Sequence, residues 1–143
     1  MLQRIQTLFL ILAVIVSAGL IFVFPLWLSG KVMVTAVDTI SSAYLWIKPI
    51  GILFILSAII SFIAIFQYNN RKFQMILVRL NILINFLLLG LIVYQVQNLS
   101  GETVVSEKDI GSFLPILAIF LLVLANRFIK KDEDLVKSVD RLR

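Results

Sequence analysis

Several residue types that carry chemistry are missing from this chain or scarce in it. There is no cysteine and no histidine among the 143 residues, and only 15% of them are Asp, Glu, Lys or Arg. Without cysteine the chain forms no disulfide and offers no thiolate to a substrate or a metal. Without histidine it lacks the commonest general base, the commonest metal ligand and the side chain that titrates near neutral pH. We therefore expect no cofactor and no metal site.

Acidic residues are missing from every long apolar stretch, because all eight lie in the connections or the C-terminal tail. Proton-coupled transporters usually need a carboxylate or histidine inside the membrane, and intramembrane proteases need paired acids or metal ligands. We therefore expect that the protein is not an enzyme. Catalysis would have to use acids of one connection, Glu102, Glu107 and Asp109, whose close spacing first indicates a solvated acidic stretch.

Apolar residues dominate the rest of the chain. They make up 61% of it, against roughly 45–50% in soluble domains, and the mean hydropathy is +1.06. A soluble fold of this size could not cover its surface with so few charges. The apolar runs predict an all-α membrane protein, a bundle of four transmembrane helices at about residues 5–28, 49–67, 79–97 and 110–129. Together residues 1–129 form the membrane domain, and residues 130–143 form a separate cytoplasmic tail.

The first run has an alternative interpretation as a cleaved signal peptide, with Arg4 as its basic flank and Ser17-Ala18-Gly19 as its small-residue cleavage site. The apolar run continues to Leu28, however, and is longer than the usual signal core of about 7–15 residues. The length of the run favours a membrane span.

The basic residues predict the orientation. Placing both termini in the cytoplasm puts ten of the thirteen Lys and Arg residues on the inner side and three on the outer side, which is the asymmetry that the positive-inside rule requires. The net charge of +5 is explained in this way, and no basic patch mixed with aromatic residues indicates nucleic-acid binding. We expect a multi-pass protein of the bacterial inner membrane. The inner residues are Arg4, Arg71, Lys72, Arg79, Arg127, Lys130, Lys131, Lys137, Arg141 and Arg143, and the outer ones are Lys31, Lys48 and Lys108.

The two outer connections carry short stretches of strand-forming residues. Val32, Val34 and Ala36 alternate in the first, and residues 103–105 of the other are Thr-Val-Val. These stretches predict a short β pairing between the two outer connections, with irregular loops as the alternative.

Polar side chains gather toward the cytoplasmic ends of the predicted helices. Asn81 and Asn85 are four residues apart and share one helix face, and Arg79, Asn126 and Arg127 complete a candidate cluster. One interpretation is a hydrogen-bonded seam that fixes how the helices pack. A second is a polar cavity that binds a lipid headgroup or small anion through Arg79, and a third is an arginine that simply extends into the headgroups.

The C-terminal tail has an amphipathic pattern. Leu135, Val139 and Leu142 recur at i, i+4 and i+7, which is one face of a helix. The face predicts either a helix lying on the inner membrane surface or a docking helix for a cytoplasmic or membrane protein partner. The mixed charges of the tail argue against a purely basic lipid anchor.

Both ends of the chain and its middle resemble a known family. The relevant segments are MLQRIQT at residues 1–7, NRK at 70–72, RLNIL at 79–83 and ANRFIKKDEDLVKSVDRLR at 125–143. They resemble an uncharacterised domain-of-unknown-function family of small four-helix inner-membrane proteins from Bacteroidetes. The resemblance implies a bacterial inner-membrane location and four spans, and it brings no reaction, ligand or catalytic residue.

Two functions follow as hypotheses. The first is a non-catalytic structural or partner-binding subunit of a membrane assembly. The alternative is a protein that binds lipid headgroups or small anions, or an uncoupled carrier, through the candidate cluster. In both cases membrane lipids surround the chain, and nucleic acid is not a partner.

Overall fold

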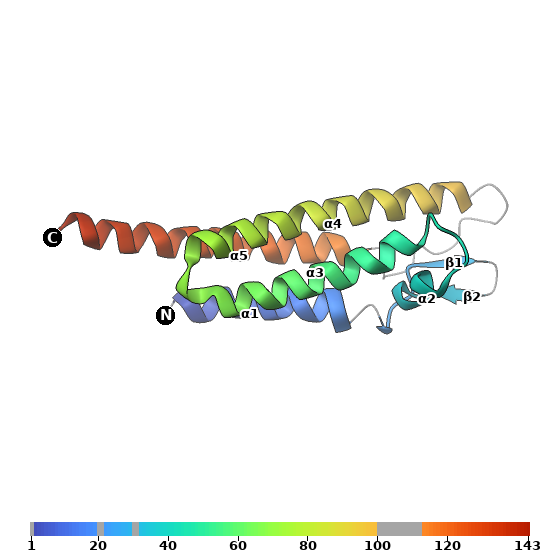
Figure 1. Ribbon diagram of the computed structural model, residues 1–143, viewed down its shortest axis with the longest axis horizontal. Helices are drawn as coiled ribbons and strands as arrows, with labels where there is room; N and C mark the ends of the chain where they lie inside the picture. The colour runs from blue at the N-terminus through green and yellow to red at the C-terminus, as the bar shows by residue number, and fades with distance from the viewer. Residues whose placement is uncertain (1, 20–21, 30–31, 100–112) are drawn as a thin grey trace.

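The computed structural model describes residues 2–19, 22–29, 32–99 and 113–143 of the chain (Figure 1). Helices account for most of these residues, as the sequence predicts. The elements in chain order are α1 (Leu2–Val14), a π-helical turn η1 (Ile15–Gly19), the strands β1 (Trp27–Ser29) and β2 (Val32–Val34), α2 (Ala36–Ser41), α3 (Lys48–Phe66), a 3₁₀ turn η3 (Gln67–Asn69), α4 (Arg71–Leu99) and α5 (Leu114–Arg141).

Four long helices form an up-and-down bundle. α1 packs against α3 and α5, and α4 packs against the same two helices, so that each helix touches two neighbours around the bundle. Figure 1 shows α3 and α4 running antiparallel from a tight turn, with the start of α1 near that turn and the last turns of α5 extending past it. We call this end of the molecule the hairpin end.

The α3–α4 hairpin follows from local sequence. Pro49 stands in the first turn of α3, where its missing N–H has no helical partner to lose. At the turn, the Asn70 side-chain oxygen accepts the backbone N–H of Phe73 at 3.3 Å, and the Asn70 carbonyl accepts that of Gln74 at 2.9 Å. Because Asn70 starts the helix and no glycine or proline follows it closely, α4 begins at Arg71 rather than at the expected residue 79.

The first helix is shorter than predicted. It was expected to reach residue 28, but the π turn η1 ends at Gly19, and Trp27–Ser29 is strand β1. Pro25 opposes a helix that continues to residue 28, because proline removes a helical N–H and disfavours helix in the residue before it. An apolar run alone could not locate this end.

The strand expected at Val32–Val34 is present as β2, and its partner is β1 of the same connection. The two strands are antiparallel, with Leu28 opposite Met33, and the N–H of Leu26 extends the pairing to the Val34 carbonyl at 2.7 Å. Residues 103–105, the partner predicted from sequence, lie outside the described residues. The short helix α2 follows β2 and was not predicted.

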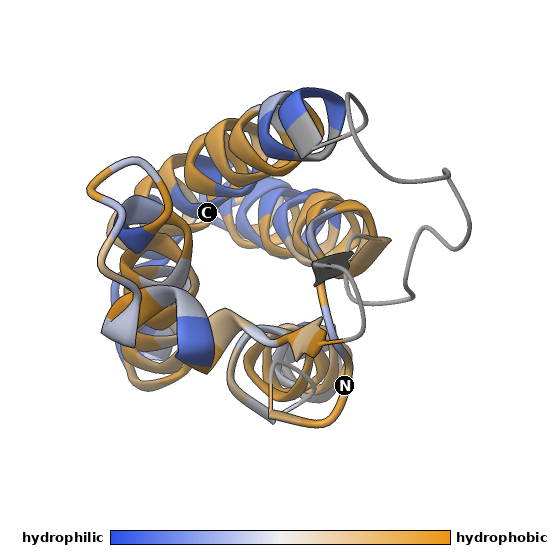
Figure 2. Cartoon of the chain, turned by 90° about the vertical axis from the view of Figure 1, so that its right-hand side faces the viewer, coloured by the Kyte–Doolittle hydropathy of each residue, from blue (hydrophilic) through white to orange (hydrophobic). Residues whose placement is uncertain are grey.

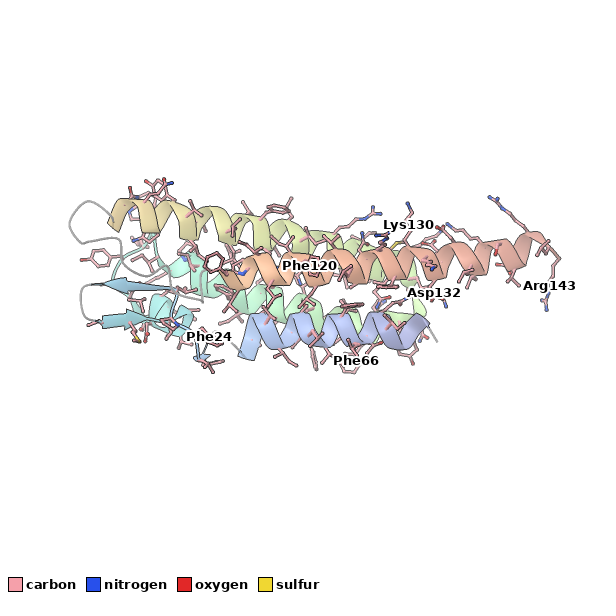
Figure 3. The ribbon with its side chains drawn as sticks, turned by 180° about the vertical axis from the view of Figure 1, so that it is seen from behind. Phe24, Phe66, Phe120, Lys130, Asp132 and Arg143 are labelled. Carbon is pink, nitrogen blue, oxygen red and sulfur yellow. The ribbon has the colours of Figure 1, made fainter. Side chains whose placement is uncertain are left out.

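The last helix runs without a break through the boundary expected at residue 130. No glycine or proline occurs after Pro115, and Glu133 and Lys137 form an i, i+4 ion pair at 3.0 Å. Residues 130–141 are therefore the final turns of α5 rather than a separate helix. Figure 3 shows these turns, from Lys130 toward Arg143, extending past the hairpin end. The start expected at residue 110 lies outside the described residues.

The bundle carries its apolar residues on the outside as well as inside. Large aliphatic and aromatic side chains are exposed along all four long helices, among them Leu8, Ile59, Leu83 and Phe120. Figure 2, which looks along the bundle, shows hydrophobic residues around the circumference of these helices. Two helical stretches, Lys48–Asn69 and Arg71–Gln95, are long and apolar enough to cross a membrane, and Ile5–Gly19 is a shorter apolar helix.

Candidate functional site

The interior of the bundle contains a hydrogen-bonded set of polar side chains centred on Ser57 of α3. Its hydroxyl accepts a hydrogen bond from Nδ2 of Asn85 on α4 at 2.9 Å. The same hydroxyl lies 3.3 Å from that of Ser17 in η1, and either can donate. One serine thus joins three chain segments.

Asn81, one turn before Asn85 on α4, extends this set. Its Nδ2 donates to the Ser57 carbonyl at 3.0 Å and to the Ser61 hydroxyl at 2.6 Å. Asn85 in turn donates to the Asn81 carbonyl at 2.9 Å. The side chains of Ser17, Ser57, Ser61, Asn81 and Asn85 are at most 1% exposed, and we call these five residues the polar network.

The polar network lies near the middle of the most apolar helices. Ser57 is nine residues from the start of α3 at Lys48, or about 14 Å along the helix axis. A buried polar group without a partner costs several kcal/mol in an apolar solvent, and every side chain of the network makes at least one hydrogen bond. The network therefore specifies which faces of α1, α3 and α4 meet and in what register.

The π-helical turn η1 brings Ser17 into this network. A π turn is rare and usually inserts one residue into an α-helix, which rotates the side chains that follow it. Ser17 and Val16 are buried in this turn, and Ser17 reaches Ser57 across the interface between the two helices. The departure from regular α-helix thus coincides with the one interhelical hydrogen bond between η1 and α3 in the described part of the chain.

Two further buried amides lie closer to the hairpin end. Nε2 of Gln6 on α1 donates to the Phe128 carbonyl of α5 at 3.1 Å, and Nε2 of Gln74 on α4 donates to the Ala64 carbonyl of α3 at 2.9 Å. The ring of Phe128 stacks on that of Phe9, with 5.5 Å between the centroids. These contacts tie α1 to α5 and α3 to α4 below the polar network.

The chemistry of the interior is limited to amides and hydroxyls. No member of the polar network titrates in the ordinary pH range, and the described residues contain no group of three or more Asp or Glu side chains arranged to hold a metal. Three amide oxygens are buried without a hydrogen-bond donor in the described part of the chain: Oδ1 of Asn85, Oε1 of Gln74 and Oδ1 of Asn126. The arrangement can orient helices and accept a hydrogen bond, but it offers no nucleophile paired with a base.

The structure divides the cluster of five residues expected from sequence. Asn81 and Asn85 are 0% exposed and belong to the polar network, whereas Arg79 and Arg127 are exposed. Two residues along a helix correspond to a rotation of about 200°, so Arg79 lies on nearly the opposite face of α4 from Asn81. Asn126 is half-buried, and its Oδ1 has no donor.

The predicted docking face is exposed on the last turns of α5. Leu135, Val139 and Leu142 are 48%, 60% and 88% exposed. One turn earlier, Oδ2 of Asp132 lies 3.2 Å from Nε of Arg71 at the start of α4. This ion pair holds α5 beside the hairpin end at the point where it leaves the bundle.

An open cleft of about 490 Å³ lies where α5 leaves the bundle. Its walls are the α3–α4 turn, residues 68–72, and three residues of α5, namely Glu133, Val136 and Lys137. The cleft adjoins the docking face, because Val136 follows Leu135 directly. The acids considered for catalysis, Glu102, Glu107 and Asp109, lie outside the described residues.

The candidate site residues expected from sequence did not include Ser17, Ser57, Ser61 or Gln74. The available signal was the match between two spacings of four residues, Ser57/Ser61 on one helix and Asn81/Asn85 on the next. Two antiparallel helices joined by a short turn bring such pairs face to face. The structure shows that these serines hydrogen-bond to the asparagines.

Comparison with known proteins gives a match to a protein-family model. The family model described as Domain of unknown function (DUF4293) matches residues 2–142, which confirms the resemblance to an uncharacterised family. No curated protein and no solved structure matches the chain.

Proposed function

We propose that this chain, which belongs to the domain-of-unknown-function family DUF4293, is a non-catalytic, partner-binding subunit of the bacterial inner membrane. In this proposal the bundle crosses the bilayer four times, and both termini lie in the cytoplasm. The observation that carries the function is the exposed apolar row Leu135, Val139 and Leu142 on a helix that continues unbroken from the bundle.

The distribution of polarity supports four spans. A water-soluble bundle buries apolar residues and exposes polar ones, whereas here buried asparagines and serines are surrounded by an exterior of Ile, Leu and Phe. Apolar surface this extensive marks contact with lipid or protein. α1 and η1 together contain 18 residues, about 27 Å of helix, and so they approach the thickness of a hydrocarbon core.

The hairpin end supports the cytoplasmic placement of both termini. It gathers Arg71, Lys72 and Arg79 of α4 with Arg127 and Lys130 of α5, as the positive-inside rule requires. Arg79 is exposed about two turns inside α4, and the Cα–Cβ bond of a helical residue tilts toward the helix N-terminus. Its guanidinium is therefore directed toward the headgroups at the hairpin end.

The partner-binding role follows from how α5 leaves the bundle. The Arg71–Asp132 ion pair joins the start of α4 to α5 where the final turns begin, and in this proposal the apolar row then stands in water beyond the membrane surface. Leucine and valine at i, i+4 and i+7 are the anchors by which an amphipathic helix docks in an apolar groove. The occupant we propose is a cytoplasmic or membrane protein with such a groove.

Crosslinking in native membranes, followed by purification in mild detergent, tests this role. The triple variant Leu135→Ser, Val139→Ser, Leu142→Ser should lose the crosslinked partner that the wild-type chain retains. The matched control, Lys137→Ser with Asp140→Ser, changes the opposite face, leaves the net charge unchanged and should keep the partner. If both variants recover the crosslinked partner equally well, the apolar row does not bind it. If the wild-type chain recovers no reproducible partner, the proposal is wrong.

A second candidate function is binding of an anionic lipid headgroup by Arg79 and Arg127. The observation that favours it is that both guanidiniums are exposed on adjacent helices, and no ion pair within the described residues occupies either of them. Native mass spectrometry should show more retained anionic lipid on the wild type than on Arg79→Gln with Arg127→Gln. Equal retention would contradict this function.

A further inference from the structure

The helices of the bundle differ in how far they extend away from the hairpin end. The Ser17–Ser57 contact sets the level of α1 against α3. The π turn η1 ends two residues later at Gly19, whereas α3 continues nine residues beyond the contact to Lys48. η1 therefore ends about 10 Å short of the far end of α3.

Residues 22–29 and 32–41 occupy this space beside α3. Figure 1 shows α2 and the β1–β2 pair beyond the end of α1 and next to the beginning of α3. α2 packs directly on α3, because a Cβ on Gly51 would lie 2.6 Å from Oγ1 of Thr39 and 2.7 Å from the Ala36 carbonyl oxygen. Both Ala36 and Thr39 are buried. We call residues 22–29 and 32–47 the cap.

The cap lies at the level of the expected outer membrane surface. Ser57 and Asn85 are hydrogen-bonded across the hairpin, and Lys48 and Tyr94 are each nine residues farther from the hairpin end. These two residues are therefore at about the same height. Lysine and tyrosine at helix ends typically mark the boundary between hydrocarbon and headgroups, and α2 at Gly51 is one turn below Lys48.

The surface of the cap is unusually apolar for a connection between helices. Within residues 22–47 only Lys31 and Asp38 are charged. Seven large side chains are between 64% and 83% exposed: Phe22, Val23, Val32, Met33, Tyr44, Leu45 and Trp46. A patch of this kind in water is a binding surface or an aggregation site.

The backbone of the cap limits how deep it can lie. Two short strands leave unpaired N–H and C=O groups along their edges, and such groups are not tolerated in hydrocarbon next to lipid. At the boundary between acyl chains and headgroups, water and lipid polar groups can satisfy them. Exposed tyrosine and tryptophan also prefer this zone.

We propose that the cap is a membrane-binding surface that lies within the acyl–headgroup boundary of the outer leaflet, with phospholipid as its partner. The inference rests on the four-span arrangement proposed above and adds that the first outer connection is immersed rather than projecting into water. The bilayer is accordingly thinner beside α1 than beside α3 and α4.

Tryptophan fluorescence can test this depth, because the chain contains only Trp27 and Trp46. Trp27→Phe leaves Trp46 as the single reporter in phosphatidylcholine vesicles. Lipids brominated near the headgroup end of the acyl chains should quench Trp46 roughly twofold more than lipids brominated near the methyl ends, because the indole lies at the interface. Iodide in the buffer should quench it weakly.

A matched reporter separates this inference from the four-span proposal. Phe120 is exposed near the start of α5 (Figure 3), in the middle of the span expected at residues 110–129. It becomes the single tryptophan in the variant Trp27→Phe, Trp46→Phe, Phe120→Trp. Quenching of this reporter mainly by deeply brominated lipids supports the spans. Suppose that the tryptophan at position 120 is quenched by deeply brominated lipids, whereas Trp46 is quenched by iodide alone or by neither iodide nor brominated lipid. The cap inference is then overturned, and the four-span arrangement remains. If iodide quenches both reporters, the four-span arrangement and the cap inference both fail.

Discussion

Asn85 of α4 donates its side-chain amide to the hydroxyl of Ser57 of α3 at 2.9 Å, and both side chains are fully buried. The contact lies in the middle of the two helices that are best suited to cross a membrane. In such a position the asparagine can replace this partner only with another group of the bundle. Their pairing therefore determines how the α3–α4 hairpin closes.

Replacing Asn85 should loosen the bundle. Asn85→Ala removes the donor to Ser57 and to the Asn81 carbonyl and should lower the free energy of unfolding by about 1–2 kcal/mol, since interhelical hydrogen bonds in membranes contribute about 0.6 kcal/mol each and at most about 1.7. Unfolding in bicelles measures the change. The control Leu83→Ala alters an exposed position two residues away and should have less than half this effect. Similar losses for both variants would contradict the stabilising role of the polar network.

Two glycines provide a matched test of the packing between α2 and α3. Gly51→Ala places a methyl group against Thr39, Ile40 and the Ala36 carbonyl, and overpacking of this kind costs about 1–3 kcal/mol. Gly90→Ala meets nothing within 4 Å and should be neutral or stabilising by up to about 1 kcal/mol, because alanine favours helix. The midpoint of thermal unfolding in detergent should therefore fall for Gly51→Ala, and it should rise or stay unchanged for Gly90→Ala. A lower midpoint for Gly90→Ala alone would refute the packing we describe.

The ion pair between Arg71 and Asp132 should restrain α5 where it leaves the bundle. Both side chains are largely buried from solvent, at 23% and 14% exposure, yet pairs near a surface contribute at most about 1 kcal/mol. Arg71→Gln should therefore leave overall stability almost unchanged and accelerate hydrogen exchange in the α5 amides after Ile129. Lys72→Gln, a neighbouring exposed lysine, should leave that exchange unchanged. If the two variants exchange alike, the ion pair does not restrain the helix.

The start of α2 should depend on pH. The backbone N–H of Thr35 and then its hydroxyl, at 3.0 and 2.7 Å from the carboxylate, hold the pKa of Asp38 below its usual 3.8 against a small opposing effect of burial. Because the folded pKa is depressed, this stabilisation is complete above the unfolded value and is lost as pH falls through the folded one. Titration of the Asp38 carboxyl by NMR should show the lowered pKa, and Thr35→Val should raise it part of the way toward 3.8. If the pKa of Asp38 is unchanged in that variant, the Thr35 hydroxyl does not contribute to lowering it.

The sequence was informative where one physical pattern dominates. The α3–α4 hairpin was predictable because Pro49 and the polar turn around Asn70 bound two apolar runs. The end of α1 was not, because hydrophobicity continues across Gly19 and Pro25 while the backbone changes from helix to strand. α2 was missed for a related reason. Its position depends on contact with Gly51, which is distant in sequence.

The candidate site was likewise predictable only in part. The spacing of Asn81 and Asn85 correctly placed them on one helix face, but Arg79 was grouped with them by proximity in sequence, and the helical rotation carries it to the other side of α4. The role of Ser17 could not be derived, because the π-helical turn that directs it toward Ser57 has no recognisable signature in residues 15–19.

Labelling of single cysteines tests the central claim, an inside-out bundle with four spans, most directly, since the native chain has no cysteine. Asn69→Cys in the α3–α4 turn, Ser106→Cys in the connection between α4 and α5, and Ser138→Cys on α5 would each be treated in intact cells with a membrane-impermeant maleimide. The account predicts that only Ser106→Cys reacts before lysis and that all three react afterwards. Reaction of Asn69→Cys or Ser138→Cys in intact cells, or recovery of the chain as a detergent-free soluble monomer, would contradict it.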